Sequence, residues 1–324
     1  MLDNDRQAVP ELIVERMRCP RCGSPISDGV VEVACGHGHR FAKHDGFVDF
    51  SADTDRVGTT ERTLTSFGYE WNAFDEVRDE DERFAEIYFR DVDLEGLRSK
   101  VGLDAGCGKG RFTRILADHL AAEVALDGSS AVEAAARNLR GHANVAVVQA
   151  DLRDAPFAPE SFDFISSLGV LHHLDDPFEG FTRLLGYLAP QGQILVYLYS
   201  RPPRRGMRSL ALQAATVLRT VTVRIPHDTL KTLSTPIAAV LYGAFVVPGR
   251  WGQRRRIRSL ADLPMDTYRD KPFRSLVLDT FDRLSAPVEH RYIWKELEPW
   301  FARTGLVVDA ARDETGWFIL AHRP

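Results

Sequence analysis

The segment "VGLDAGCGKGRFT" at residues 101–113 decides the fold, because it leads from a short apolar run through three glycines into a helical pattern. Glycine adopts backbone conformations that other residues avoid, and it lets a ligand approach the main chain closely. Gly106, Gly108 and Gly110 follow the spacing G-x-G-x-G, whereas a dinucleotide site prefers G-x-G-x-x-G at a helix that meets a pyrophosphate. The turn therefore predicts a strand-to-helix binding loop for a ligand without phosphate.

Around this turn, residues 100–200 alternate apolar runs of strand length with longer stretches of helical period, which predicts a parallel sheet with crossover helices. Strands are expected at 101–104, 123–127, 144–149, 162–166 and 193–199, and helices near 111–121, 130–140 and 177–188. A helix at 294–303 and the strands "LVVDA" (306–310) and "WFILA" (317–321) predict a closing hairpin at the sheet edge. The expected fold class is α/β, with a doubly wound, mostly parallel, seven-stranded Rossmann-like sheet.

Two acidic residues follow the turn at the ends of the next strands, where they can hold a nucleoside. Asp127 closes the second strand in "EVALDGSS", and its two oxygens can accept both ribose hydroxyls. Asp151 in "VVQADLRD" is placed for an adenine amino group, and Asp104 offers a carboxylate to the cationic end of S-adenosylmethionine, which has no phosphate. The sequence therefore predicts S-adenosylmethionine as the cofactor. The candidate binding residues are Asp104, Gly106, Gly108, Gly110, Asp127, Gly128, Asp151, Leu152 and Leu168, with Leu126 adding to the apolar wall.

Four segments of this region carry a family resemblance: "LDAGCGKG", "ALDGS", "QADLRDAPFAPESFDFISS" and "LGVLHHLDDP". They stand in the order found in class I S-adenosylmethionine-dependent methyltransferases, and the chain resembles the type 11/25-like domain of that family. The resemblance covers roughly residues 99–200 and the closing elements after 289. It implies a Rossmann-like methyltransferase fold and the methyl donor, and it is silent about the methyl acceptor.

The segment "FGYEWNAF" at residues 67–74 resembles an aromatic helix that precedes the core in a subset of bacterial methyltransferases and folds over the cofactor. By this resemblance Tyr69 and Trp71 are candidate lid residues. The alternative is ordinary hydrophobic packing of an N-terminal helix.

Three histidines are candidates for a general base. His172 and His173 follow the fourth strand at the carboxyl end of the sheet, and His290 stands in "APVEHRYIW". The family often carries "LHH" at this point without using it as a base. Methyl transfer depends on in-line alignment of acceptor, methyl carbon and sulfur more than on proton abstraction. The catalytic residues are therefore left open.

The cysteines near the N-terminus predict a metal site. Cys19 and Cys22 form a C-x-x-C pair, and Cys35 and His39 form a C-x-x-x-H pair, which together match a closed tetrahedral site for structural zinc. His39 is preferred over His37 and His44 because the following "RF" resembles the zinc ribbon of a bacterial ribosomal-RNA guanine methyltransferase. Unliganded buried cysteines are the alternative.

Length, charge and cysteine content limit the classes of protein to which the chain can belong. The chain has 324 residues and a net charge of −5, which gives no global attraction to nucleic acid. Four cysteines do not describe a disulfide scaffold. The first 17 residues lack the pattern of a secretory signal, so a cytoplasmic location is expected. No stretch reaches the apolar length needed to cross a bilayer, and residues 230–247 come closest.

Residues 201–288 interrupt the order of the sheet and are interpreted as a helical insertion, with helices near 207–222 and 228–247. The expected domain organisation has five parts: a zinc-ribbon-like domain (1–50), a linker with lid helices (51–98), the methyltransferase core (99–200), the insertion as a substrate cap (201–288) and the end of the core (289–324).

The acceptor has two competing interpretations. Apolar helices after the fifth strand favour a small-molecule or lipid-like acceptor, and their basic flanks suit peripheral membrane contact. The zinc ribbon and the arginines at 201–208 and 250–258 favour an rRNA or tRNA base instead. A third alternative is a non-catalytic interaction protein that binds the cofactor for stability. Its expected signature, a damaged glycine loop or a missing ribose carboxylate, is not seen.

Overall fold

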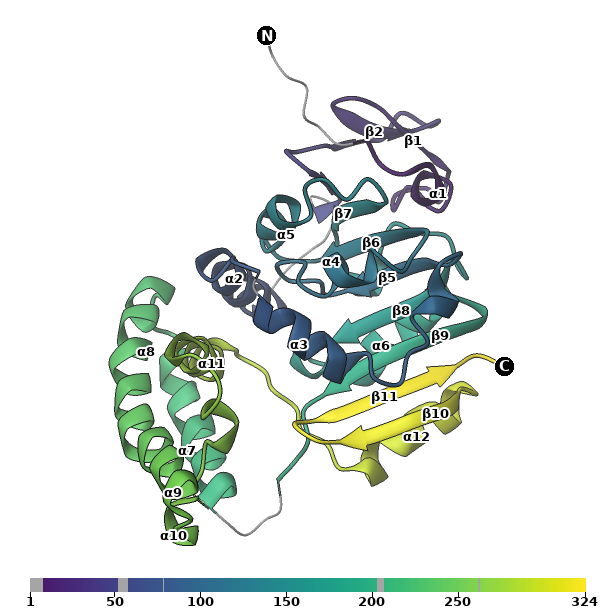
Figure 1. The fold of residues 1–324 in the computed structure, drawn as a ribbon. Coiled ribbons are helices and arrows are strands. Elements are labelled where there is room, and N and C mark those ends of the chain that lie inside the picture. Colours follow the sequence, from purple (N-terminus) through teal and green to yellow (C-terminus); the bar gives the residue numbers. More distant parts are fainter. Residues whose placement is uncertain (1–7, 52–57, 78, 203–206, 262) are drawn as a thin grey trace. The chain divides into compact units, whose positions relative to one another are not determined.

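The computed structural model describes residues 8–51, 58–77, 79–202, 207–261 and 263–324. The chain divides into two compact units, which we call the sheet unit (Met1–Arg201 with Val288–Pro324) and the helical unit (Pro202–Pro287). Figure 1 shows the elements of both. Residues 1–50 belong to the sheet unit in this division, and the five-part organisation expected from the sequence stays a prediction.

The sheet unit is built on eight strands in the order β10-β11-β9-β8-β5-β6-β7-β4. Neighbours from β9 to β4 are parallel, whereas β11 runs antiparallel to both β9 and β10. The mostly parallel α/β fold and the edge hairpin are therefore confirmed. The strands are β4 (Phe47–Asp49), β5 (Val101–Ala105), β6 (Ala122–Asp127), β7 (Val145–Gln149), β8 (Phe162–Leu168), β9 (Leu188–Leu198), β10 (Val307–Asp313) and β11 (Trp317–His322).

The expected count of seven strands is wrong, because β4 adds an eighth at the edge beside β7. Its register pairs Phe47 with Val147 and Val48 with Val148. A strand of three residues is too short to show the alternation that identifies a strand in a sequence. Strand β4 also lies within residues 1–50, which the sequence predicts to be a separate zinc-ribbon-like domain.

The N-terminal residues form a small antiparallel sheet of β1 (Ile26–Asp28), β2 (Glu32–Cys35) and β3 (Arg40–Ala42), preceded by the short helix α1 (Glu11–Val14). Their apolar side chains belong to the same buried cluster as those of the main sheet. Phe41 stacks on Phe50 with ring centroids 4.7 Å apart. The N-terminal sheet therefore shares the core of the main sheet.

The helices of the sheet unit are α2 (Gly58–Ala73), α3 (Asp79–Tyr88), α4 (Thr113–Leu116), α5 (Val132–Asn138), α6 (Pro177–Tyr187) and α12 (Trp294–Thr304). The sequence predicts a helix over 111–121, but α4 is much shorter. After Leu116 the amides of Asp118 and His119 bond carbonyls three residues back rather than four, so the chain leaves the α-helix in tight turns.

The helical unit contains α7 (Met207–Thr222), α8 (His227–Leu241), α9 (Val247–Arg255), α10 (Arg258–Ala261) and α11 (Phe273–Ser285). A π-helical stretch, Tyr242–Val246, joins α8 to α9 without a break. Pro248 follows at once, and the widened turn relieves the clash between a proline ring and the carbonyl four residues earlier.

The continuous helix His227–Arg255 corrects the expectation that no segment reaches membrane-spanning length. It has 29 residues with a mean hydropathy of 1.5 in its apolar window, and by length and composition alone it could cross a membrane. The sequence predicts a helix near 228–247, and the structure continues it to Arg255.

The shared core predicts that the N-terminal segment contributes to the stability of the whole sheet unit. Ile13 is fully buried, whereas its neighbour Leu12 is 41% exposed. Ile13→Ala should lower the free energy of unfolding by about 2–4 kcal/mol through lost burial and the cavity left behind. Leu12→Ala should change it by less than about 0.5 kcal/mol. Equal effects of both variants in urea titrations would show that α1 does not pack on the sheet.

Candidate functional site

A pocket opens at the carboxyl ends of β5, β6 and β8. Along the chain, β5, β6 and β7 progress toward one edge of the sheet, and β8 then returns to the other side of β5. In open α/β sheets this reversal leaves a crevice in which ligands bind. The pocket is lined by nine of the predicted cofactor residues: Trp71, Asp104, Gly106, Gly108, Asp127, Gly128, Asp151, Leu152 and Leu168, together with Leu126 of the predicted wall.

The glycine turn forms the floor of the pocket, and Gly106, Gly108 and Gly110 all have positive φ. Gly106 has φ +90°, and an added Cβ would lie 2.3 Å from the side chain of Val170. Gly108 has φ +55°, and its Cβ would lie 2.9 Å from the indole nitrogen of Trp71. Gly110 packs against Leu139 and does not line the pocket. The turn therefore brings bare backbone to the ligand at Gly106 and Gly108.

Asp127 ties the end of β6 to the glycine turn. One carboxylate oxygen accepts from the backbone N–H of Gly108 at 2.9 Å. The other accepts from the N–H and the hydroxyl of Ser129, at 2.8 and 2.6 Å. Hydrogen bonds of this kind hold a carboxylate in one orientation. The acidic side chain that the sequence assigns to the ribose is thus fixed at the pocket wall.

Asp104 is a buried carboxyl at the end of β5. It is only 2% exposed and accepts hydrogen bonds from the hydroxyls of Thr113 (2.7 Å) and Ser166 (3.2 Å). Burial raises the pKa of Asp104 to about 6, although these two hydrogen bonds lower it. An ionised carboxylate in such a place favours a cationic partner, because a nearby positive charge offsets its lost hydration.

Asp151 has a partner that sequence reasoning missed. Two guanidinium nitrogens of Arg153 donate to the Asp151 carboxylate, at 3.0 and 2.6 Å. The backbone N–H of Arg153 donates to the same carboxylate at 2.9 Å. Arg153 also lines the pocket. A ligand that contacts Asp151 therefore meets a carboxylate that is already paired, and Arg153 fixes its orientation.

Helix α2 closes one side of the pocket with the face formed by Thr60, Thr63, Leu64, Phe67 and Trp71. Of the two expected lid residues, Trp71 lines the pocket and Tyr69 does not. The guanidinium of Arg111 lies 5.4 Å and the ammonium of Lys109 lies 5.7 Å from the Trp71 ring centroid. The spacing of three and four residues along α2 is the signal that could have found Phe67.

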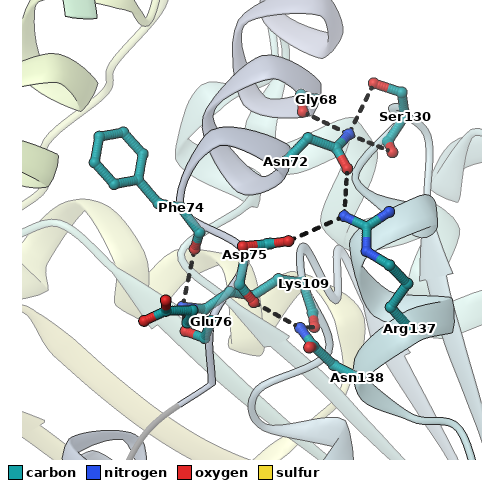
Figure 2. Close-up of polar contacts among 9 residues, drawn as sticks. All are labelled: Gly68, Asn72, Phe74, Asp75, Glu76, Lys109, Ser130, Arg137 and Asn138. Carbon is teal, nitrogen blue, oxygen red and sulfur yellow. Dashed lines mark hydrogen bonds and ion pairs between the residues drawn. The ribbon is translucent and has the colours of Figure 1, made fainter.

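Polar contacts fasten the end of α2 to the sheet unit (Figure 2). The amide of Asn72 donates to the carbonyls of Gly68 at 3.0 Å and Ser130 at 2.9 Å. Arg137 of α5 donates to the side-chain oxygens of both Asn72 and Asp75, each at 3.2 Å. The helix that covers the pocket is therefore held on α5.

A second group of contacts joins the segment after α2 to the glycine turn itself, as Figure 2 also shows. The Lys109 ammonium donates to the carbonyls of Phe74 (3.2 Å) and Glu76 (2.6 Å). The amide of Asn138 bridges the carbonyls of Asp75 (2.8 Å) and Lys109 (2.9 Å). The turn and the helix above it thus form one cross-linked element.

Of the three histidine candidates, His173 alone lines the pocket. Its Nδ1 lies 2.6 Å from the carbonyl oxygen of Val288. A carbonyl can only accept, so Nδ1 carries the hydrogen and the lone pair of the neutral ring is on Nε2. The ring of Phe67 packs against it with centroids 4.7 Å apart.

His172 and His290 lie beside His173 and away from the pocket lining. His172 is fully buried, and burial holds its pKa well below the usual range, so the ring is neutral. Within the described residues, neither of its ring nitrogens has a hydrogen-bond partner. Its ring packs at a tilt against Tyr199, with centroids 4.0 Å apart, and the backbone N–H of His290 donates to the His172 carbonyl at 2.8 Å. Both residues fit a packing role.

The four predicted metal ligands come together in the N-terminal sheet. The ligand atoms of Cys19, Cys22, Cys35 and His39 all lie within 4.8 Å of one another. The sulfurs of Cys22 and Cys35 are 3.7 Å apart, close to the separation of about 3.8 Å that two thiolates have on one tetrahedral zinc ion. Nδ1 of His39 lies 3.3 Å from the sulfur of Cys19.

The competing histidines are placed differently. Nδ1 of His37 lies 2.8 Å from the hydroxyl of Ser24 and 3.6 Å from the sulfur of Cys22. His44 faces the carboxylate of Asp49 at 3.6 Å. Neither histidine belongs to the group of four ligand atoms.

Comparison with known proteins places a domain on this part of the chain. Residues 103–196 match the family model described as a methyltransferase domain. A demethylmenaquinone methyltransferase of Clavibacter sepedonicus is 37% identical over 109 residues, which cover 32% of this chain and 44% of that protein. A tRNA U34 carboxymethyltransferase of Methylococcus capsulatus is 34% identical over 98 residues, covering 29% and 30%. The chain spans less than half the length of these relatives.

Solved structures include an S-adenosylmethionine-dependent methyltransferase from Mesorhizobium loti. It is 17% identical, covers 75% of this chain and 100% of its own, and has a TM-score of 0.46.

The raised pKa of Asp104 predicts a stability that depends on pH. The folded protein holds the Asp104 proton more tightly than the unfolded chain, so this stabilisation is full below about pH 4 and is lost as pH rises through about 6. The ionised carboxylate then costs about 3 kcal/mol at neutral pH. Asp104→Asn should flatten this part of the stability profile, and denaturant titrations from pH 4 to 7 measure it. An unchanged profile would contradict the assignment, and the exposed Asp118→Asn serves as the control.

Proposed function

We propose that this chain, whose residues 103–196 form a domain of the methyltransferase family, binds S-adenosylmethionine in the pocket and transfers its methyl group to a small-molecule or lipid-like acceptor. One observation carries the proposal. The bare glycine turn, the buried carboxyl of Asp104 and the fixed carboxylate of Asp127 line a single pocket at the reversal of strand order.

The residues of the pocket suit the parts of this cofactor. Asp127 would accept from the two ribose hydroxyls, and Asp104 would face the cationic amino acid end. A Cβ at Gly106 or Gly108 would collide with Val170 or Trp71, two side chains that line the pocket, so the shape of the pocket depends on both glycines. The side chains of Leu126 and Leu168 would flank the adenine.

The bound cofactor supplies a methyl group on a positively charged sulfur. A lone pair of the acceptor would take this methyl group, and the electron pair of the carbon–sulfur bond would stay on sulfur. The chain's part is to align the acceptor and to exclude water. Nε2 of His173 is the candidate to take the acceptor's proton, where the acceptor has one to lose.

The apolar side of the pocket supports a small or lipid-like acceptor. Leu64 and Phe67 from α2 and Val170 and Leu174 after β8 add hydrocarbon surface beside the turn. Pockets with mostly apolar walls and a few fixed polar groups suit small molecules. The relative named as a demethylmenaquinone methyltransferase supports the same class.

An RNA base is the second candidate acceptor. The group of Cys19, Cys22, Cys35 and His39 and the relative named as a tRNA carboxymethyltransferase favour it. Methyl transfer to extracted lipid, small-molecule and RNA fractions separates the two, using the purified protein and labelled cofactor. Label in the lipid or small-molecule fraction is expected, and label in RNA alone would replace the first candidate by the second.

The cofactor assignment predicts a loss of binding in Asp127→Asn. Removing the charge should weaken the affinity for S-adenosylmethionine at least about tenfold, since a hydrogen bond to a charged group contributes about 1.5–3 kcal/mol. Isothermal titration calorimetry measures it, with the exposed Asp118→Asn as the matched control. Unchanged affinity in Asp127→Asn would remove this residue from the site. A wild-type protein that binds S-adenosylmethionine but transfers no methyl group to any of the fractions would favour the non-catalytic interaction protein.

We also propose that Cys19, Cys22, Cys35 and His39 hold a structural zinc ion. Three thiolates and one imidazole fill a tetrahedral site and leave no position for substrate. The ion would link the loop after Cys19 to the end of β2. Its part in the function would therefore be to fix the N-terminal sheet.

The zinc proposal predicts about one zinc ion per chain in the purified protein. His39→Ala should lose most of this metal, whereas His37→Ala should keep it, because Nδ1 of His37 lies against Ser24. Inductively coupled plasma mass spectrometry of the three proteins gives the result. Wild-type protein with far less than stoichiometric zinc, or equal metal content in both variants, would rule out this ligand set.

A further inference from the structure

The helix His227–Arg255 exposes a row of apolar side chains, which we call the apolar stripe. They recur every three or four residues and follow its solvent-facing side. The exposed fraction is 70% for Val240 and 50% for Trp251. The stripe consists of Leu233, Ile237, Val240, Ala244, Val247 and Trp251.

The stripe is not the core of the helical unit, because the unit has its own. Leu230, Ala238 and Val246 are buried on the other side of the same helix, and Leu276 and Phe281 of α11 are buried as well. Helix α8 packs on α11, as Figure 1 also shows. The stripe is therefore additional apolar surface that the packing of the unit does not use.

The length of the stripe distinguishes it from scattered apolar residues. Residues 232–249 contain no Asp, Glu, Lys or Arg. Only 22% of the apolar window of the helix is buried. Continuous exposed apolar surface of this kind marks a contact with another molecule or a membrane.

The helical unit that carries the apolar stripe is also positively charged. Residues 202–287 contain 15 Arg and Lys against six Asp and no Glu, a net charge of +9 in a chain whose total is −5. Arg254 and Arg255 end the helix and Arg256 follows it, and all three are exposed. The guanidinium of Arg255 lies 5.9 Å from the ring centroid of Trp251. Apolar side chains beside a tryptophan and a cluster of arginines match the boundary between the acyl chains and headgroups of an anionic bilayer.

We propose that the helical unit docks on the surface of an anionic lipid bilayer. The helix His227–Arg255 lies in the plane of the interface, with the apolar stripe in the acyl boundary and Arg254, Arg255 and Arg256 at the headgroups. This deepens the proposed function, because a lipid-like acceptor would be met at the same surface. Docking itself requires neither cofactor nor methyl transfer.

The chemistry of the stripe favours lipid over nucleic acid, since aliphatic side chains neither pair with phosphates nor stack on bases as aromatic rings do. The helix also remains within its unit. Its buried side includes the polar Ser234, and Arg250 donates to the hydroxyl of Tyr242 and to the carbonyl of Arg269. Spanning a bilayer would break the contact between Arg250 and Arg269 and would place the Arg250 guanidinium near hydrocarbon. The helix is accordingly assigned to the surface.

Vesicle binding by the full chain tests the proposal, without cofactor or acceptor. Vesicles of phosphatidylcholine with about one third phosphatidylglycerol should bind the protein at low salt, whereas phosphatidylcholine alone should bind it weakly. The double variant Ile237→Gln/Val240→Gln should bind at least about tenfold more weakly, because apolar area no longer enters the interface. Val30→Gln/Val31→Gln is the matched control, since both valines are exposed in the sheet unit.

The arginines and Trp251 provide independent measurements. Arg254→Gln/Arg255→Gln should remove the preference for anionic vesicles and flatten the salt dependence. Brominated lipid should quench tryptophan fluorescence in the wild type, and Trp251→Phe should abolish that quenching. These readings hold even where the double variant of the stripe fails to fold.

Several results would overturn the proposal. Wild-type protein that binds neither type of vesicle at low salt would do so, as would equal losses in the stripe variant and the matched control. A dimer in solution that Ile237→Gln/Val240→Gln converts to monomer, without vesicle binding, would assign the stripe to a second copy. A gel shift of RNA lost in Arg254→Gln/Arg255→Gln, again without vesicle binding, would assign the unit to nucleic acid. Vesicle binding without methyl transfer would contradict the proposed function alone.

Discussion

The hydrogen bond from the backbone of Gly108 to the carboxylate of Asp127 joins the two strand ends on which the pocket depends. It works only because Gly108 adopts positive φ and has no side chain in the space beside Trp71. The turn is also bound from above, where Lys109 donates to the carbonyls after α2. The end of β6, the glycine turn and helix α2 are therefore linked by hydrogen bonds into one unit. A change in any of them moves the walls that face the ligand.

The site also lowers the stability of the fold, because it contains the buried carboxyl group of Asp104. A protein core normally excludes carboxyl groups, yet Asp104 is 2% exposed, and burial raises its pKa to about 6. Thr113 and Ser166 supply hydrogen bonds that offset part of the cost of ionising it. Packing alone gives no reason for an acid here. A cationic ligand would explain the acid, because its attraction to the ionised carboxylate would offset the hydration free energy that the carboxylate loses on burial.

The sequence predicted what periodicity and turn chemistry encode. Apolar runs that end in glycine or aspartate marked the central strands, and the pairs around Cys19 and Cys35 marked four side chains that the structure brings within 4.8 Å. The features that the sequence did not predict depend on contacts between distant segments or on very short elements. Strand β4 has three residues, and the ion pair of Arg153 with Asp151 depends on the conformation of the Arg153 side chain, which the sequence does not give. The helix near 228–247 was predicted, but its continuation to Arg255 was not, and the π-helical stretch before Pro248 has no signal in the sequence.

The two proposals share one physical argument. A lipid-like acceptor partitions into a bilayer, so its concentration in water is low and a pocket that waits in solution seldom meets it. A unit with a net charge of +9 and a long exposed apolar stripe would keep the protein at the surface where the proposed acceptor would be concentrated. The pocket then needs only modest affinity, and its binding energy can serve to align the acceptor with the methyl carbon. This accounts for a helical insertion that leaves so much apolar surface exposed, which a simple cap over the core would not require.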